Sequence, residues 1–104
     1  MKNYKWVVVM GVEEYREHLN DIFFKSGITV FSEVQVKGFR YTQSRLAGDG
    51  LQNNKLDPTY SLVSFAMTQE DNAKTVLAEI KTFNNSRQKA RPLHAFQVDI
   101  EAMA

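Results

Sequence analysis

The order of hydrophobic and polar residues divides the chain into segments of regular structure. Residues 4–10 are β-branched and apolar at odd and even positions alike, which is typical of a central strand covered on both faces. From residue 12 to 25, apolar side chains recur every three or four positions, as in an amphipathic helix. Gly27 follows where a glycine would stop that helix.

The same reading continues after Gly27. Residues 28–41 alternate and predict a long strand. The apolar parity changes after Gly38, which indicates a β-bulge or a strand that enters different surroundings. Residues 60–67 predict a third strand that is apolar on both faces, and Thr68 is placed to cap a second amphipathic helix, whose apolar face runs from residue 73 to 83.

A last alternating strand, expected at 93–101, completes the order β-α-β-β-α-β. This order is typical of the α+β, ferredoxin-like split βαβ fold with an antiparallel sheet. Residues 42–59 lack periodicity and contain many turn formers, so we expect a long loop between strands two and three. We interpret residues 1–104 as one domain. Helices cover only one face in this topology, yet both central strands look apolar on both faces, and an oligomer is the simplest explanation.

Composition narrows the function classes. The 104 residues include 13 Lys+Arg and 12 Asp+Glu, for a net charge of +1, and 43% are hydrophobic. The absence of cysteine excludes disulfides, a thiolate nucleophile and Cys-rich metal sites. The balanced charge argues against nucleic-acid binding, which needs a cationic excess. The longest apolar run, residues 6–12, is far shorter than a membrane span. We therefore expect a cytoplasmic protein without direct membrane insertion.

Candidate chemistry is confined to a few places. No nucleophilic triad, catalytic carboxylate pair or phosphate-binding glycine loop is present, so no catalytic residue is assigned. No carboxylate lies between Glu79 and Asp99, and the stretch between them favours a phosphate or another anion. Its cationic residues are Lys81, Arg87, Lys89 and Arg91. His18, one turn after Glu14, and His94 could each ligate a metal, but two ligands do not make a site.

Two motifs at a fixed spacing resemble the PII signal-transduction family. The sequence Gly27-Ile28-Thr29 leads to Val36-Lys37-Gly38-Phe39 and then to the long loop, as the family's GIT…EVKGF strand leads into its T-loop. The spacing fits without a gap, and residues 14–19 look like the family's helix start, D-x-V-R-E-A-L. The resemblance implies a homotrimer whose open sheet faces meet at the centre. It also implies an effector, such as an adenine nucleotide, bound in clefts between subunits.

Several positions depart from the family pattern. The family's phosphate-binding B-loop, TGxxGDGK, corresponds to residues 87–94, which keep cations but lack glycine. No tyrosine stands in mid-loop, where the family is uridylylated, and Thr42 stands in place of the loop-base glutamine. Ser32 keeps a hydroxyl where the family has threonine. These differences predict a divergent PII-like regulator that senses another ligand or a metal.

The resemblance and the basic stretch together define a non-catalytic regulator as the leading hypothesis. The expected ligand-binding residues are Ser32, Gly38, Phe39, Thr42, Arg87, Lys89, Arg91 and His94. The loop 42–59 is expected to bind a membrane transporter or an enzyme, and its candidate contact residues are Arg45, Gly48, Asp49, Gly50 and Lys55. Two alternatives stay open: a CutA-like trimer for divalent-metal tolerance, and a small ferredoxin-like enzyme or ligand-binding dimer with a pocket between sheet and helices.

Overall fold

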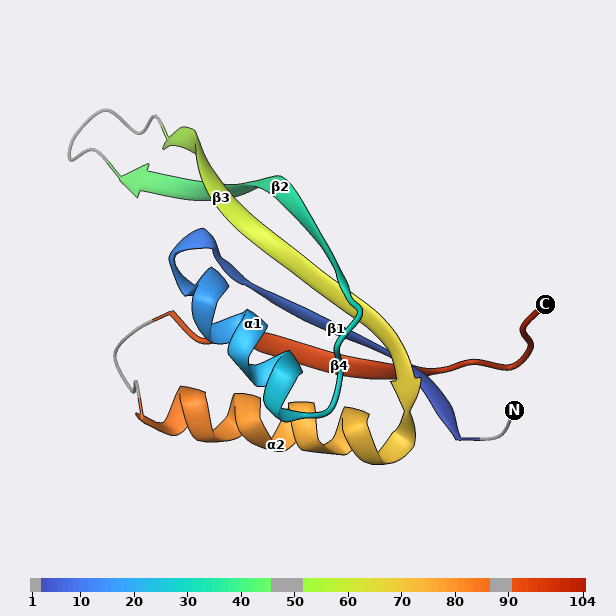
Figure 1. Ribbon diagram of the computed structural model, residues 1–104. Coiled ribbons are helices and arrows are strands. Elements are labelled where there is room, and N and C mark those ends of the chain that lie inside the picture. Colours follow the sequence, from blue (N-terminus) through green and yellow to red (C-terminus); the bar gives the residue numbers. More distant parts are fainter. Residues whose placement is uncertain (1–2, 46–51, 87–90) are drawn as a thin grey trace.

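Four strands and two helices form one layer of sheet covered by one layer of helix (Figure 1). The computed structural model describes residues 3–45, 52–86 and 91–104, with the backbone alone at 40–45 and 52–60. The elements are β1 (Tyr4–Val12), a 3-10 turn η1 (Glu13–Tyr15), α1 (Arg16–Lys25), β2 (Ser32–Arg45), β3 (Gln52–Gln69), α2 (Glu70–Ser86) and β4 (His94–Asp99). The sheet is antiparallel in the order β2-β3-β1-β4, which confirms the predicted α+β, βαββαβ fold.

The strand register decides which side chains share a face. β1 pairs with β3 on one side, so that Val7 lies opposite Ala66, and with β4 on the other. Val7, Val9 and Ala66 are buried with the helices. Because neighbouring residues of a strand point to opposite faces, Trp6 and Met10 lie on the face that no helix covers. We call this the open face, and its hydrophobic residues are Trp6, Val8, Met10, Val34, Val36, Val63, Phe65, Met67, Phe96 and Val98.

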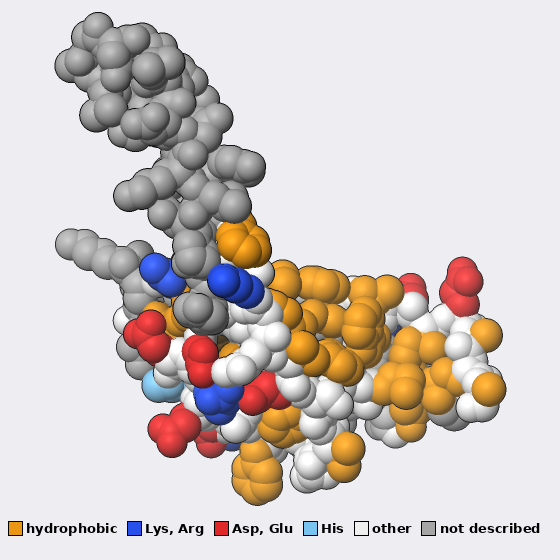
Figure 2. Space-filling view, turned by 90° about the horizontal axis from the view of Figure 1, so that it is seen from above, with side chains coloured by type: hydrophobic (Ala, Val, Ile, Leu, Met, Phe, Trp, Pro, Cys, Tyr) orange, Lys and Arg blue, Asp and Glu red, His pale blue; other side chains and the backbone are white. Residues whose placement is uncertain are grey.

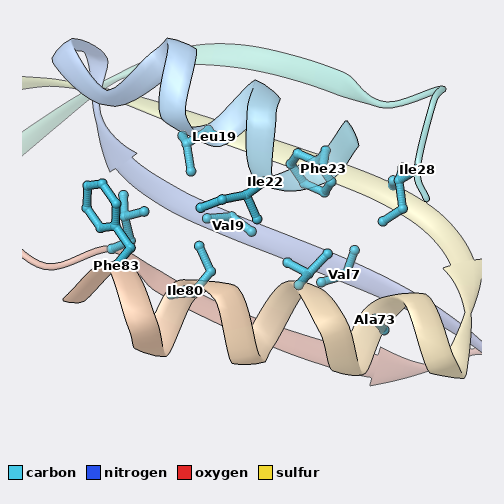
Figure 3. Packing of buried hydrophobic residues seen from close by; sticks show 12 residues of the cluster. Val7, Val9, Leu19, Ile22, Phe23, Ile28, Ala73, Ile80 and Phe83 are labelled. Carbon is cyan, nitrogen blue, oxygen red and sulfur yellow. The ribbon is translucent and has the colours of Figure 1, made fainter. Parts of the chain in front are cut away.

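The hydrophobic core lies between the sheet and the two helices (Figure 3). Phe23 of α1 is fully buried, and its ring stacks on Phe31 with the centroids 4.7 Å apart. The residues from α1 and α2 point toward β1 and toward one another, as the periodicity of residues 12–25 and 73–83 predicts. The cluster comprises Val7, Val9, Leu19, Ile22, Phe23, Ile28, Ala66, Ala73, Val76, Ile80, Phe83 and Leu93.

Gly27 ends α1 as predicted. Its φ of 84° lies in the left-handed region, where a side chain is strained. The Ile28 amide donates to the Phe23 carbonyl at 2.9 Å, and the Gly27 amide donates to the Phe24 carbonyl at 3.1 Å. These two bonds form a Schellman motif, and they satisfy carbonyls that the helix end leaves unpaired.

Gly27→Ala is therefore expected to lower the free energy of unfolding by about 1–2 kcal/mol, because alanine is strained at a left-handed φ. Urea unfolding followed by circular dichroism measures the loss. Gly27→Asn is the matched control, since asparagine tolerates this conformation and should cost less. If Gly27→Ala were as stable as the parent chain, the cap would not stabilise α1.

The segment between β2 and β3 differs from the predicted loop. The ladder of pairs runs from Ser32↔Phe65 to Arg45↔Gln52, so the predicted loop residues 42–45 and 52–59 are paired strands. β1 pairs with β3 only as far as Ser61, and beyond it β2 and β3 pair with each other alone. We call this two-stranded extension, residues 37–45 and 52–60, the arm. It projects from the sheet in Figure 1, and the radius of gyration, 17.4 Å, exceeds the value of about 13 Å expected for a compact domain of this size.

No bulge interrupts the ladder at Gly38, which pairs with Thr59 in the same register as its neighbours. The predicted bulge is therefore wrong. The parity change instead marks the point at which β2 leaves the sheet and enters the arm, which is the second interpretation of the pattern. Apolar residues after this point have no sheet face to cover.

Four other predicted features also differ. The first helix opens with the 3-10 turn η1, and β2 begins at Ser32 rather than residue 28. Thr68 is not a helix cap, because it pairs with Lys5 inside the sheet and accepts a hydrogen bond from the Asn72 side chain at 3.1 Å. α2 continues to Ser86 and so takes in residues expected in the basic loop.

Candidate functional site

The open face is the largest unusual feature of the surface. Trp6, Met67 and Phe96, from three different strands, keep 42%, 54% and 43% of their surface exposed. Figure 2 looks at the molecule from above and shows hydrophobic side chains gathered in broad groups on this side of the surface. Monomeric soluble proteins seldom expose an apolar patch that spans a whole sheet, so this face has the character of an interaction surface.

A groove of about 710 Å³ crosses the end of the open face that lies away from the arm. Trp6, Phe65 and Met67 line its floor, and the tail that follows β4 contributes Met103. The rings of Trp6 and Phe65 meet edge to face with their centroids 5.8 Å apart. Ser32, a predicted ligand residue, also lines this groove. The sequence predicts the apolar face but not this groove, because its walls come from residues 30–32 and from the tail after β4.

The predicted ligand residues do not come together within one chain. Ser32, Gly38 and Phe39 lie on β2 at one edge of the sheet, whereas His94 begins β4 at the other edge and Arg91 precedes it. Two strands separate these edges, so they are about 14 Å apart at the interstrand spacing of about 4.8 Å. Ser32 and Gly38 are themselves about 20 Å apart along β2, and the side chain of Phe39 points to the face of the strand opposite to that of Ser32 and Gly38. One subunit therefore holds two separate parts of the predicted set.

The remaining predicted residues lie on or beyond the arm and the basic loop. Thr42 takes part in the ladder opposite Lys55, and Arg45 closes it opposite Gln52. Five predicted residues lie outside the described part of the chain: Gly48, Asp49, Gly50, Arg87 and Lys89. The described remainder of the basic stretch has Lys81 on α2 and Arg91 before β4, and both are exposed.

A second hollow, of about 380 Å³, lies between α2 and the start of β4. Its residues include Lys81, Asn84 and His94. Asn84 holds the two elements together, since its amide donates to the Leu93 carbonyl at 2.9 Å and accepts from the Leu93 amide at 2.8 Å. His94 is exposed, because its pairing with Met10 places it on the open face together with Phe96.

A polar cluster connects the start of the helical layer to β2 just before the arm. Arg16 Nε donates to Glu33 Oε2 at 2.9 Å, and Gln35 donates to Glu13 at 2.8 Å. Arg16 also lies 3.8 Å from Glu13. Glu33 and Gln35 lie on the helix side of β2 and are exposed, so these contacts join the edge strand to the start of the helical layer at the surface. The cluster fixes β2 at the foot of the arm.

The candidate metal ligands have other roles or stand apart. The ring of His18 packs edge to face against Phe83 at 5.3 Å and against Tyr15 at 6.3 Å, so it extends the aromatic edge of the core. Within residues 3–45, 52–86 and 91–104, no three His, Asp or Glu residues are grouped so that they could hold a metal ion. The described residues therefore add no observation in favour of the CutA-like alternative.

Lys5 joins three elements at the groove end of the sheet. Its ammonium group forms an ion pair with Asp99 of β4 and lies 3.9 Å from Glu70 of α2. The hydrogen bond to Asp99 and the charges of both carboxylates raise the pKa of Lys5 above its usual value.

Neither described helix has the length and hydropathy that a membrane crossing requires.

Comparison with known proteins identifies the fold. No protein-family model and no curated protein sequence matches the chain. Among solved structures, B. subtilis GlnK is similar over 91% of this chain and 84% of its own, with a TM-score of 0.67 and 11% identity. The periplasmic divalent cation tolerance protein CutA from Archaeoglobus fulgidus is similar over 97% and 87%, with a TM-score of 0.62 and 12% identity.

A third similar structure is CPII from Thiomonas intermedia K12, a nitrogen regulatory PII-like protein bound to ADP, AMP and bicarbonate. It covers 95% of this chain and 96% of its own, with a TM-score of 0.57 and 14% identity. At these identities the likeness is one of fold. The chain has the fold shared by PII and CutA proteins, which confirms the resemblance at that level.

Proposed function

We propose that this chain is a non-catalytic, PII-like regulator that assembles as a homotrimer through its open face. An anionic effector, such as an adenine nucleotide, then binds between β2 of one subunit and the start of β4 of the next. The arm binds a partner, either a membrane transporter or an enzyme, and the protein acts in the cytoplasm.

The observation that carries this proposal is the uncovered, apolar open face. It includes Trp6, Met67 and Phe96 at about half exposure. A second copy would remove these side chains from water, and each square ångström of apolar surface buried contributes about 25 cal/mol. A cyclic assembly repeats one interface, and it therefore covers every open face in the same way.

The separation of the predicted ligand residues also supports assembly. Ser32 and Gly38 lie at one sheet edge and Arg91 and His94 at the other, so a single subunit holds both halves of a site without joining them. A neighbouring copy can bring its β4 edge to the β2 edge of the first. The nucleotide-bound state of CPII, a protein of this fold, supports the choice of effector class.

The test is a thermal-shift panel of ATP, ADP, AMP, cyclic nucleotides and divalent metals on protein whose mass is measured by light scattering. We expect a trimer, and a nucleotide at a hundred times its Kd to stabilise it by about 2.7 kcal/mol. For a domain of this size, that energy raises Tm by roughly 10 °C or more. A shift with divalent metals and none with nucleotides would favour the CutA-like alternative instead.

Arg91→Glu is expected to abolish the nucleotide shift, because the substitution replaces an exposed cation near the anion with a like charge. Lys25→Glu, the same charge change at the exposed end of α1, is the control and should retain the shift. A monomeric mass, or a shift that survives Arg91→Glu, would contradict this assignment.

A further inference from the structure

The hollow between α2 and β4 has features of a small-molecule site that the proposed trimer does not require. Its lining residues come from α2 and from residues 93–96. Its volume, about 380 Å³, falls within the range of about 300–1,000 Å³ that is usual for ligand sites. Leu77 and Ile80 line it from the helix, Leu93 lines it from the segment before β4, and Ala95 lines it from the strand. These walls suit an apolar ring more than a hydrated ion.

A positive charge, that of Lys81, lies at the hollow. Lys81 lines it and is exposed, and His94 lines it from the strand. Lys74, about two turns earlier on α2, forms an ion pair with Glu70 at 3.2 Å. Lys81 forms no ion pair with any residue in the described part of the chain, and no carboxylate lines the hollow. Its ammonium group is therefore available to an anion.

Asn84 does not supply the recognition. The nitrogen and the oxygen of its side-chain amide both form hydrogen bonds with the Leu93 backbone. These bonds connect the two walls of the hollow and occupy the side chain. The site thus has fixed walls before a ligand enters, and a preformed site loses less conformational entropy on binding. What it offers a ligand is apolar surface beside positive charge.

From this combination we infer that the hollow binds a small anion that carries an apolar ring, such as an aryl phosphate. The ring lies against Leu77 and Ala95, and the anionic group contacts Lys81. The inference goes beyond the proposed function, because the hollow is formed by α2 and residues 93–96 and needs neither β2 nor the arm.

Three probes separate the contributions of ring and charge. Phenyl phosphate, benzyl alcohol and inorganic phosphate are each titrated into ¹⁵N-labelled protein and followed by amide chemical shifts. We expect phenyl phosphate to shift amides around Leu77, Lys81 and Ala95 and to bind about ten-fold or more tightly than either other probe. Equal affinity for phosphate alone, equal affinity for benzyl alcohol, or shifts confined to the open face would each overturn the inference.

Lys81→Glu tests the residue that carries the charge. It is expected to weaken phenyl phosphate binding about ten-fold or more, since it removes a charge-assisted contact. Lys74→Glu makes the same change on the same helix, outside the hollow, and should leave the affinity within two-fold, or about 0.4 kcal/mol. Unchanged affinity in Lys81→Glu would refute the role of this lysine.

The same titration in Met67→Glu, designed below to be monomeric, distinguishes the two proposals. Retained binding places the site within one subunit, whereas lost binding means that a second copy completes it and the inference is wrong while the trimer stands. A parent chain that is monomeric and still binds phenyl phosphate would overturn the proposed function and leave this inference intact.

Discussion

Met67→Glu is expected to convert the proposed trimer into monomers at micromolar concentration. Met67 lies on the central strand β3 in the open face and keeps 54% of its surface exposed in the single chain. A carboxylate there is solvated in the monomer, but it would be stripped of water in an interface. The effective cost of burying an unpaired ion is several kcal/mol, and a cyclic assembly would bury one per subunit.

Light scattering and sedimentation measure the mass, and circular dichroism checks that the fold is kept. Phe24→Glu is the matched control, because Phe24 is also a large exposed hydrophobic residue, at 68%, but lies on α1 away from the open face. It should leave the mass unchanged. If Met67→Glu retained the parent mass, the open face would not be the assembly surface.

Phe23→Ala is expected to cost about 3–5 kcal/mol of unfolding free energy, because it removes a fully buried ring and leaves a cavity. Small domains have only about 5–15 kcal/mol in total, so the variant would lose much of its stability. Phe23 also stacks on Phe31 and packs where the Schellman motif brings Ile28 beside it. The loss therefore extends to the connection between α1 and β2.

Urea unfolding measures this difference, and Phe24→Ala supplies an adjacent control. Both residues are phenylalanines on α1, but they differ in burial: Phe24 is 68% exposed, whereas Phe23 is fully buried. We expect the control to change stability by no more than about 0.5 kcal/mol. Similar losses in both variants would mean that burial does not decide the effect, since alanine is the better helix former at both positions.

The sequence predicts most of the sheet and helices because each buries a face. A buried face imposes a period of two on strands and of 3.6 on helices, and both periods are visible in residues 4–25 and 60–83. The two-sided apolar character of β1 and β3 likewise predicts the open face. Gly27 is predictable because its function is local, at a helix end.

The arm and the site are harder to predict for physical reasons. Beyond Lys37 the two strands pair outside the four-stranded sheet, so no buried face imposes alternation, and residues 42–45 and 52–59 look aperiodic. The double hydrogen bond between Asn84 and Leu93 joins residues nine apart, and no local pattern marks it. The family resemblance predicts the ligand residues as a single group, whereas the strand order places those on β2 and those around the start of β4 at opposite edges of the sheet.

The unbroken ladder between β2 and β3 limits how the arm can change length. From Ser32↔Phe65 to Arg45↔Gln52, each step forward along one strand is one step back along the other. A single inserted residue in either strand would shift every later pair and exchange the two faces of the ribbon. Residues added in equal numbers to both strands would instead extend the reach by about 3.4 Å per pair and leave the sheet as it is. Engineered variants of the arm should therefore tolerate paired insertions and resist unpaired ones.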